Sequence, residues 1–179
     1  SYTVPRKTII INDNTEIKIV EKEIEEDVAV VVDRFGYIKS VDLNSYNRTT
    51  EDTLSLFKNK FIVKNTSKIC VFTDKGFVAQ LKVSDIPSGK IRDKGAAIDV
   101  LCKLKDCGKI LLITPLDDKN VTFVFKNGFI KNVPLMEYES RQKLITATKL
   151  YDSEIIDILR TNKDSVLKVM ISGKEKSIN

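Results

Sequence analysis

A short motif centred on a glycine recurs along the chain, and this repetition constrains the fold more than any other feature. The stretch "VVDRFGYIKSVDL" (residues 31–43) is followed by "FTDKGFVAQLKV" (72–83) and by "FKNGFIKNVPL" (125–135). Periods of about 40 to 50 residues are typical of propeller-like arrays, in which each repeat forms one small sheet. The glycines are spaced by 40, 52 and 45 residues, at Gly36, Gly76, Gly128 and Gly173.

Each copy of the motif predicts a β-hairpin. A run rich in β-branched residues precedes every glycine, and apolar and polar residues alternate after the first three. Alternation with a period of two is typical of strands, and glycine adopts the positive φ of a tight turn without a Cβ clash. The four runs before the glycines are residues 28–32, 69–72, 121–125 and 166–171.

Further β-rich segments lie between the hairpins. Residues 61–65, 110–116 and 155–160 precede the later three hairpins and end in polar turns, so each repeat is predicted to be a three-strand meander. The linkers "NRTTEDTLSLF", "PSGKIRDKGAAIDVLCKL" and "ESRQKLITATKL" contain short apolar segments that we expect to supply a fourth strand.

These elements predict an all-β fold. We expect a propeller-like disc of repeated four-stranded blades over residues 28–179, partial or truncated, with about three to four blades. A plain β-sandwich is the alternative. An α/β fold needs helices between the strands, and only residues 14–27 have a helical pattern, which we interpret as part of a lead-in segment at residues 1–27.

The composition narrows the possible functions. None of the 179 residues is a histidine, so the chain lacks the commonest general base near neutral pH and the commonest metal ligand. Cys70, Cys102 and Cys107 are too few for a disulfide framework and lack zinc-site spacing. Without an apolar run of about 18 residues or a secretory start, we expect a cytoplasmic protein.

No catalytic residue and no metal site is assigned. Tyr37, Tyr46 and Tyr138 stand near the hairpins, at positions where packing is expected. Asp117 and Asp118 form an acidic pair, but they lie in a predicted turn, where carboxylates usually bond to their own backbone.

Positive charge is concentrated in the repeats. The net charge is +5, with −3 in residues 1–27 and +8 in residues 28–179. This balance favours a polyanionic partner, and a merely solubilising surface is the alternative. Cations recur in the loops between repeats and at the position three residues after a hairpin glycine. In the second of these loops, Gly89 and Gly95 are expected to let the backbone approach a phosphate. The candidate phosphate-contacting residues are Lys39, Arg48, Lys90, Arg92, Lys94, Lys131, Arg141, Lys143 and Lys176.

Several stretches resemble a known family. "DVAVVVDRFGYIKSVDLNSY", "ICVFTDKGFVAQLKVSDIP", "AAIDVLCKL" and "KLITATKLYDSEIIDIL" are similar to the C-terminal domain of the A subunit of bacterial DNA gyrase and of its paralogue, topoisomerase IV. "PRKTII" resembles the segment that joins the breakage-reunion core to that domain. The resemblance implies a β-pinwheel, a disc whose blades exchange strands and whose basic rim binds and bends duplex DNA.

The resemblance also implies partners and a role. The domain itself is expected to be non-catalytic, because the family's catalytic tyrosine lies in the breakage core. It would position the transported duplex within an ATP-dependent type IIA topoisomerase, beside the rest of the A subunit and the ATPase B subunit. No cofactor is expected in this domain, ATP and magnesium being bound elsewhere in the holoenzyme, and no membrane is involved. The expected location is the bacterial cytoplasm, on the nucleoid.

One segment departs from the gyrase pattern. In gyrase a Gln-Arg-Arg-Gly-Gly-basic-Gly box follows the first blade, whereas "LNSYNRTTEDTLSLF" here has Arg48 as its one basic residue and no glycine. The departure favours a topoisomerase IV-like A subunit. A protein-interaction propeller with a basic, solubilising rim remains the alternative function.

Overall fold

The computed structural model describes residues 24–165, 167–171 and 174–178, with side chains for residues 24–165. Residues 1–23, most of the expected lead-in, and Gly173 of the fourth hairpin lie outside the described residues. Of the segment with a helical pattern, residues 24–26 are irregular, and the first strand begins at Asp27. No helix in the described residues is long and apolar enough to cross a membrane.

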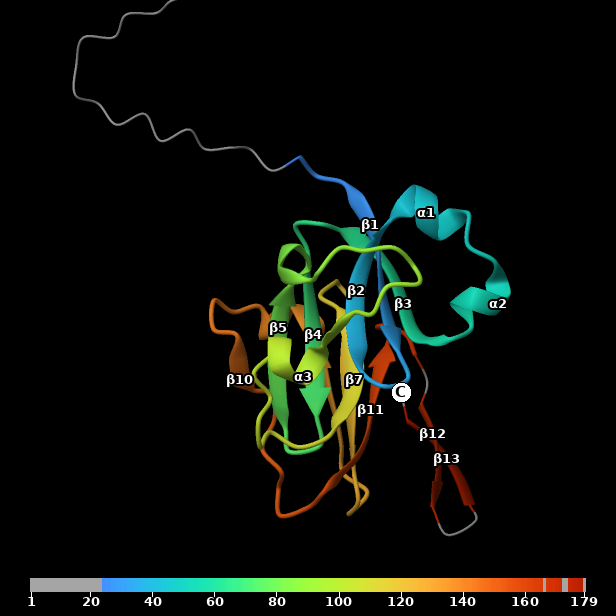
Figure 1. The fold of residues 1–179 in the computed structure, drawn as a ribbon. Coiled ribbons are helices and arrows are strands. Elements are labelled where there is room, and N and C mark those ends of the chain that lie inside the picture. Colours follow the sequence, from blue (N-terminus) through green and yellow to red (C-terminus); the bar gives the residue numbers. More distant parts are fainter. Residues whose placement is uncertain (1–23, 166, 172–173, 179) are drawn as a thin grey trace, which may run out of the picture.

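The described chain is an array of small antiparallel sheets, as the repeat predicts (Figure 1). Sheet A has the strand order β3-β1-β2-β6, sheet B has β10-β5-β4-β7, sheet C has β11-β8-β9, and β12 pairs with β13. The strands of sheet A are β1 (Asp27–Asp33), β2 (Tyr37–Asp42), β3 (Phe57–Lys64) and β6 (Ala96–Ala97). Those of sheet B are β4 (Lys68–Thr73), β5 (Phe77–Lys82), β7 (Ile110–Pro115) and β10 (Leu144–Thr146). The remaining strands are β8 (Asn120–Phe125), β9 (Ile130–Pro134), β11 (Ile155–Thr161), β12 (Leu167–Ile171) and β13 (Lys174–Ile178).

The three described glycine turns confirm the predicted hairpins. Gly36, Gly76 and Gly128 have φ values of 84°, 78° and 83°, in the left-handed region that favours glycine. The amide of Gly76 donates to the carbonyl of Thr73 at 3.1 Å. A Cβ on Gly76 would also lie 2.5 Å from the carbonyl oxygen of Thr148, so this turn needs glycine for space as well as for its backbone angle.

The expected meander was wrong, because the strand before each later hairpin belongs to the preceding sheet. In sheet A, β3 pairs with β1, placing Phe61 opposite Val30. β7 pairs in the same way with β4, and β11 with β8. The polar turn after each of these strands therefore leads from one sheet into the next.

The fourth strand of a sheet comes from one repeat further along. β6, from the second linker, pairs with β2 of sheet A, and β10, from the third linker, pairs with β5 of sheet B. The second and third linkers thus supply strands as predicted, although to the sheet before. The first linker instead contains the short helix α2 (Glu51–Leu54), and a second short helix, α1 (Leu43–Asn47), ends at its first residue. This strand exchange ties neighbouring sheets together.

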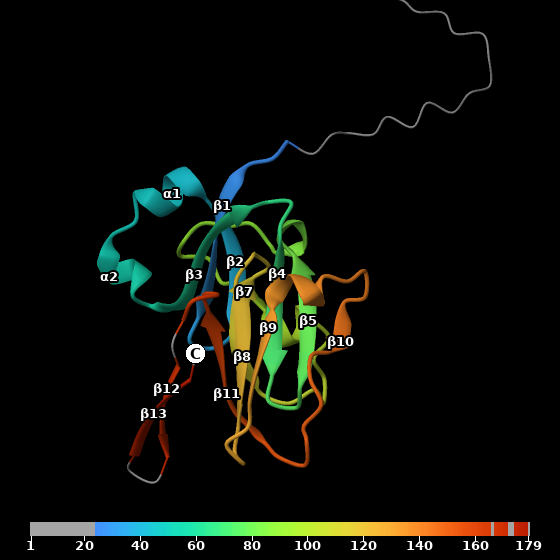
Figure 2. The same ribbon diagram turned by 180° about the vertical axis from the view of Figure 1, so that it is seen from behind.

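The exchanged strands lie on the outside of the array. β3 contacts β7, and β7 contacts β11, so these three edge strands face one another at the centre. β6 and β10 form the opposite edges of sheets A and B, and β10 is the outermost labelled strand on its side of the array in both views (Figures 1 and 2). We call this outer edge the rim.

Two apolar cores fill the spaces between sheets. One lies between sheets A and B and includes Val30, Ile69 and Ile98. The other lies between sheets B and C and is built on Phe72 and Phe123, whose rings meet edge to face at 5.8 Å. Each sheet is thus held on its neighbour by burial of apolar side chains, which fixes the rim segments of adjacent sheets relative to each other.

Candidate nucleic-acid interface

Two basic loops occupy equivalent places on the rims of neighbouring sheets. Rim loop A (residues 87–95) connects the 3-10 helix η1 (Val83–Asp85) to β6, and rim loop B (residues 139–143) connects η2 (Leu135–Tyr138) to β10. Each loop runs along the second hairpin strand of the preceding sheet before adding its own short strand there. The two loops therefore hold equivalent positions in successive sheets.

Rim loop A is fastened to strand β2. The amide of Ser40 donates to the carbonyl of Pro87, and the amide of Gly89 donates back to the carbonyl of Ser40, both at 3.0 Å. The amino group of Lys39 donates to the carbonyl oxygens of Ile91 and Asp93, the former at 2.5 Å. The backbone of the loop is therefore held at several points.

Lys39 is a structural residue in this arrangement. It is 5% exposed, its amino group lies 5.3 Å from the ring centre of Phe57, and burial lowers the pKa of its amino group. Because its donors are directed at the loop carbonyls, its head group is turned away from solvent and from any phosphate. Lys39 is therefore not exposed to a phosphate backbone, contrary to the expectation from its position three residues after a glycine.

The glycines of rim loop A serve packing within the protein. A Cβ on Gly95 would collide with the carbonyl oxygen of Ile38, so glycine lets the loop approach strand β2. At Gly89 the nearest atom to a Cβ would be a carboxylate oxygen of Asp93 at 3.1 Å, and that same oxygen accepts the amide of Lys90 at 2.8 Å. The close approach expected towards a phosphate is thus made within the protein, to the backbone of Ile38 at Gly95 and to the side chain of Asp93 at Gly89.

Three cations of rim loop A face outward. Lys90, Arg92 and Lys94 are exposed, and none of them makes an ion pair among the described residues. The amino group of Lys94 lies 4.4 Å from the ring centre of Tyr37, a cation–π contact that orients it without neutralising it. Arg92 and Lys94 border a cavity of about 440 Å³ beside the first hairpin.

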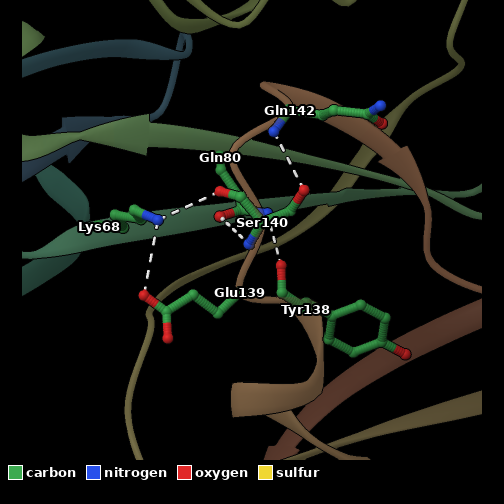
Figure 3. A network of polar contacts seen from close by, with 6 residues as sticks. All are labelled: Lys68, Gln80, Tyr138, Glu139, Ser140 and Gln142. Atoms are coloured by element: carbon green, nitrogen blue, oxygen red, sulfur yellow. Dashed lines mark hydrogen bonds and ion pairs between the residues drawn. The ribbon is translucent and has the colours of Figure 1, made fainter.

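Rim loop B is fastened by Gln80, which stands on β5 (Figure 3). The side-chain amide of Gln80 donates to the carbonyl of Tyr138 at 2.5 Å and accepts the amide of Ser140 at 3.2 Å. Its own backbone amide donates to the carbonyl of Lys143 at 2.7 Å. Gln80 is 6% exposed, so a buried side chain fixes this loop much as Lys39 fixes the other.

Tyr138 is a packing residue, as predicted. It is 5% exposed, its ring meets that of Phe72 edge to face at 5.3 Å, and its hydroxyl donates to the carbonyl of Ala147 at 3.1 Å. Burial raises the pKa of its hydroxyl, since the charged form loses hydration.

The cations of rim loop B have close neighbours. Arg141 and Lys143 are exposed, and the amino group of Lys143 lies 3.7 Å from a carboxylate oxygen of Asp85. A cavity of about 400 Å³ lies beside them, and Lys68 and Lys82, which were not among the candidates from the sequence, line it together with Arg141 and Lys143. The sequence does show that Lys68 and Lys82 lie at the two ends of the hairpin around Gly76. In a chain with 30 basic residues, however, two single lysines cannot be distinguished from ordinary surface lysines.

The other candidate residues lie apart from these loops. Arg48 is exposed at the C-terminal end of α1. Lys131 is half-buried on β9, with its amino group 3.4 Å from the hydroxyl of Thr148. Lys176 lies on β13 opposite Val169, and its side chain is outside the described residues. The structure therefore places the five loop cations on two equivalent loops of adjacent sheets, and leaves the strand cations and Arg48 elsewhere.

Known proteins with similar sequences are topoisomerase subunits. The chain is 30% identical over 195 residues to the A subunit of DNA gyrase from Campylobacter jejuni, an alignment that covers 99% of this chain and 22% of that protein. It is 28% identical over 191 residues to the A subunit of DNA topoisomerase 4 from Staphylococcus aureus, covering 97% of this chain and 23% of that protein. The chain thus spans less than a quarter of the length of these relatives. No family model matches it.

Solved structures with the same fold are C-terminal domains of such subunits. The C-terminal domain of DNA topoisomerase IV superposes with a TM-score of 0.68 at 23% identity, over 82% of this chain and 49% of that one. The E. coli ParC C-terminal domain superposes with a TM-score of 0.65 at 14% identity, over 86% of this chain and 64% of that one. The described residues therefore have the β-pinwheel fold of these domains.

Proposed function

We propose that this chain is the DNA-binding and DNA-bending C-terminal domain of a type IIA topoisomerase A subunit. One observation carries the proposal: two equivalent basic loops, each fastened by a buried polar side chain, lie on the rims of adjacent sheets. Its relatives are A subunits of gyrase and topoisomerase IV. In this role the domain positions the transported duplex for strand passage.

The chemistry of the loops suits a phosphate backbone. Lysine and arginine side chains on a rigid edge contact phosphates without reading bases, so binding is expected to tolerate any sequence and to depend on DNA shape. Bending a site of 20 to 30 base pairs costs roughly 1 to 6 kcal/mol, which several contacts together must offset. The exposed cations of rim loops A and B, on two neighbouring sheets, supply such a set of contacts.

The proposal assigns the remaining roles to other parts of the enzyme. Strand cleavage, ATP and magnesium belong to the rest of the A subunit and to the B subunit, and the complex acts on the nucleoid in the cytoplasm. A topoisomerase IV-like subunit is favoured, because the segment after the first hairpin has Arg48 as its one cation and begins α2 with Glu51 and Asp52. Carboxylates there oppose the wrapping of DNA around that part of the rim.

Salt dependence tests the proposal. Binding to a duplex of about 40 base pairs is expected to weaken steeply with salt, with a slope of log affinity against log salt near −0.9 for each phosphate contacted. Fluorescence anisotropy with two unrelated sequences measures both the slope and the sequence tolerance. An affinity that hardly changes between about 50 mM and about 200 mM salt would contradict phosphate-based binding.

A protein-interaction role is the second candidate, and one observation favours it. Phe35 and Val100, 76% and 72% exposed, line a groove of about 900 Å³ between sheets A and B. Large exposed apolar side chains beside a groove are typical of docking surfaces. A gel shift with bare duplex DNA separates the two candidates, since a pure docking module would leave the DNA unshifted.

A further inference from the structure

Two lysines face each other directly in sheet B. In the β4–β5 hairpin Lys68 is the cross-strand partner of Lys82, so both side chains leave the same face of the sheet. Like charges placed opposite each other destabilise a hairpin. The repeat shows that this pairing is not required by the fold, because the matched pairs are Val28 with Asp42 in sheet A and Asn120 with Pro134 in sheet C.

The two lysines belong to a cluster of four cations. Arg141 and Lys143 of rim loop B line the same cavity of about 400 Å³ as Lys68 and Lys82. Among the described residues two carboxylates offset this charge, Glu139 at 3.6 Å from Lys68 and Asp85 at 3.7 Å from Lys143. Both carboxylates are well exposed, so they screen the cluster only in part.

Several residues that line the cavity are held by hydrogen bonds. Gln80, which lines the cavity, is buried and bonds to rim loop B through both ends of its amide group. Lys68 donates to the carbonyl of Ser140 at 3.2 Å, and the hydroxyl of Ser140 accepts the amide of Gln142 at 3.0 Å (Figure 3). A ligand that enters the cavity therefore does not have to order this part of the loop.

We propose that this cavity is a binding site for a single phosphate group. An arginine and three lysines present donors to the oxygens of a tetrahedral anion, and the anion in turn relieves the repulsion between Lys68 and Lys82. If the chain binds DNA as proposed above, the group is a backbone phosphodiester, and sheet B carries the anchoring contact. Among the described residues, rim loop A has no comparable pair: Lys90, Arg92 and Lys94 project from the loop itself, and strand β2 beneath it has no lysine paired with another lysine.

Lys82 is the side chain to change first, since it is exposed and makes no side-chain hydrogen bond or ion pair within the described residues. For Lys82→Ala, DNA affinity is expected to fall roughly threefold to tenfold, with the salt slope reduced by about 1. The unfolding midpoint should stay the same or rise, because the repulsion with Lys68 is removed. Loss of binding without loss of stability separates a ligand site from a structural role.

Two further variants are expected to change the DNA affinity in other ways, one by strengthening binding and one by leaving it unchanged. Glu139→Gln removes a carboxylate that competes with the anion, so it is expected to strengthen binding. Lys105→Ala is the matched control, an exposed lysine on the groove between sheets A and B, and it should leave the affinity unchanged. If Lys82→Ala binds DNA like the parent chain, or if Lys105→Ala loses as much affinity as Lys82→Ala, the anchoring site is refuted.

Titration with inorganic phosphate shows whether the site binds a free phosphate ion or only the phosphodiester of a duplex. It also separates this inference from the proposed function. In the parent chain the amide chemical shifts of Ser140 and Lys143 are expected to move as phosphate is added, and in Lys82→Ala they are expected to move much less. Phosphate shifts without any duplex binding would support the site and overturn the DNA-binding function. Duplex binding that depends on Lys90, Arg92 and Lys94 but not on Lys82 would support the function and overturn the site.

Discussion

The amino group of Lys39 donates a 2.5 Å hydrogen bond to the carbonyl oxygen of Ile91, 52 residues further along the chain. Gln80 makes the corresponding bond to the carbonyl of Tyr138, 58 residues away, in the next sheet. In both cases the residue stands on the second strand of a hairpin and holds a loop that belongs to the next repeat. The exchange of strands between sheets thus also positions the outward cations on the rim.

Lys39→Met tests whether this lysine positions rim loop A. The variant keeps the apolar stem and loses both bonds to the loop, while it also removes a poorly hydrated charge. These effects oppose each other, so the free energy of unfolding is expected to change by less than about 1.5 kcal/mol. Hydrogen exchange at the Asp93 amide, which donates to the carbonyl of Lys90, should accelerate, and DNA affinity should fall. Unchanged exchange and affinity would show that the loop holds its own shape.

Replacing Lys90, Arg92 and Lys94 together by alanine removes the outward charge of rim loop A. The affinity for duplex DNA is expected to fall at least tenfold at about 150 mM salt, with a salt slope lower by up to about 3, because each cation releases about one counterion from a phosphate. Lys58, Lys105 and Lys109, three exposed lysines along the groove between sheets A and B, provide a control triple variant of equal charge change. Equal losses in both triples would mean that net charge alone drives binding.

Gly95→Ala tests the close packing of rim loop A on β2. An added Cβ meets the backbone carbonyl of Ile38, which cannot move without disturbing the pairing of β2 with β6. The loss of stability is expected to exceed about 2 kcal/mol in urea unfolding. Gly89→Ala is the matched control, because its nearest neighbour is the movable carboxylate of Asp93, and it should cost less than about 1 kcal/mol. A mild effect at Gly95 would contradict the tight contact.

The buried thiols predict a loss of stability at alkaline pH. Burial raises the pKa of Cys70 and of Cys102 to about 12, since a thiolate would be poorly hydrated there. The folded chain holds these protons more tightly than the unfolded chain, so their contribution is present below the unfolded pKa near 8.5 and is lost as the pH rises towards 12. Urea midpoints measured between about pH 8 and pH 10.5 should fall more steeply for the parent chain than for a Cys70→Val, Cys102→Val variant. Parallel curves would contradict the linkage.

Local features of the fold were predictable from the sequence. The turns at Gly36, Gly76 and Gly128 and the strands around them follow from glycine's backbone freedom and from period-two alternation, which act over a few residues. The equivalence of the two rim loops also follows from the repeat. In the site, Arg92 and Arg141 were found because they sit in matched linkers, whereas Lys68 and Lys82 were missed because facing pairs are visible only once the register is known.

By itself, then, the sequence determined where hairpins form, which residues they bury and which loops carry positive charge. The tertiary structure alone decided which sheet each additional strand joins, because alternation specifies a buried face and says nothing of the partner along an edge. It also decided that Lys39 is buried while Lys90 is exposed. Whether a lysine is buried depends on which distant segment of backbone packs over it, and the exchange of strands between sheets brings that segment there.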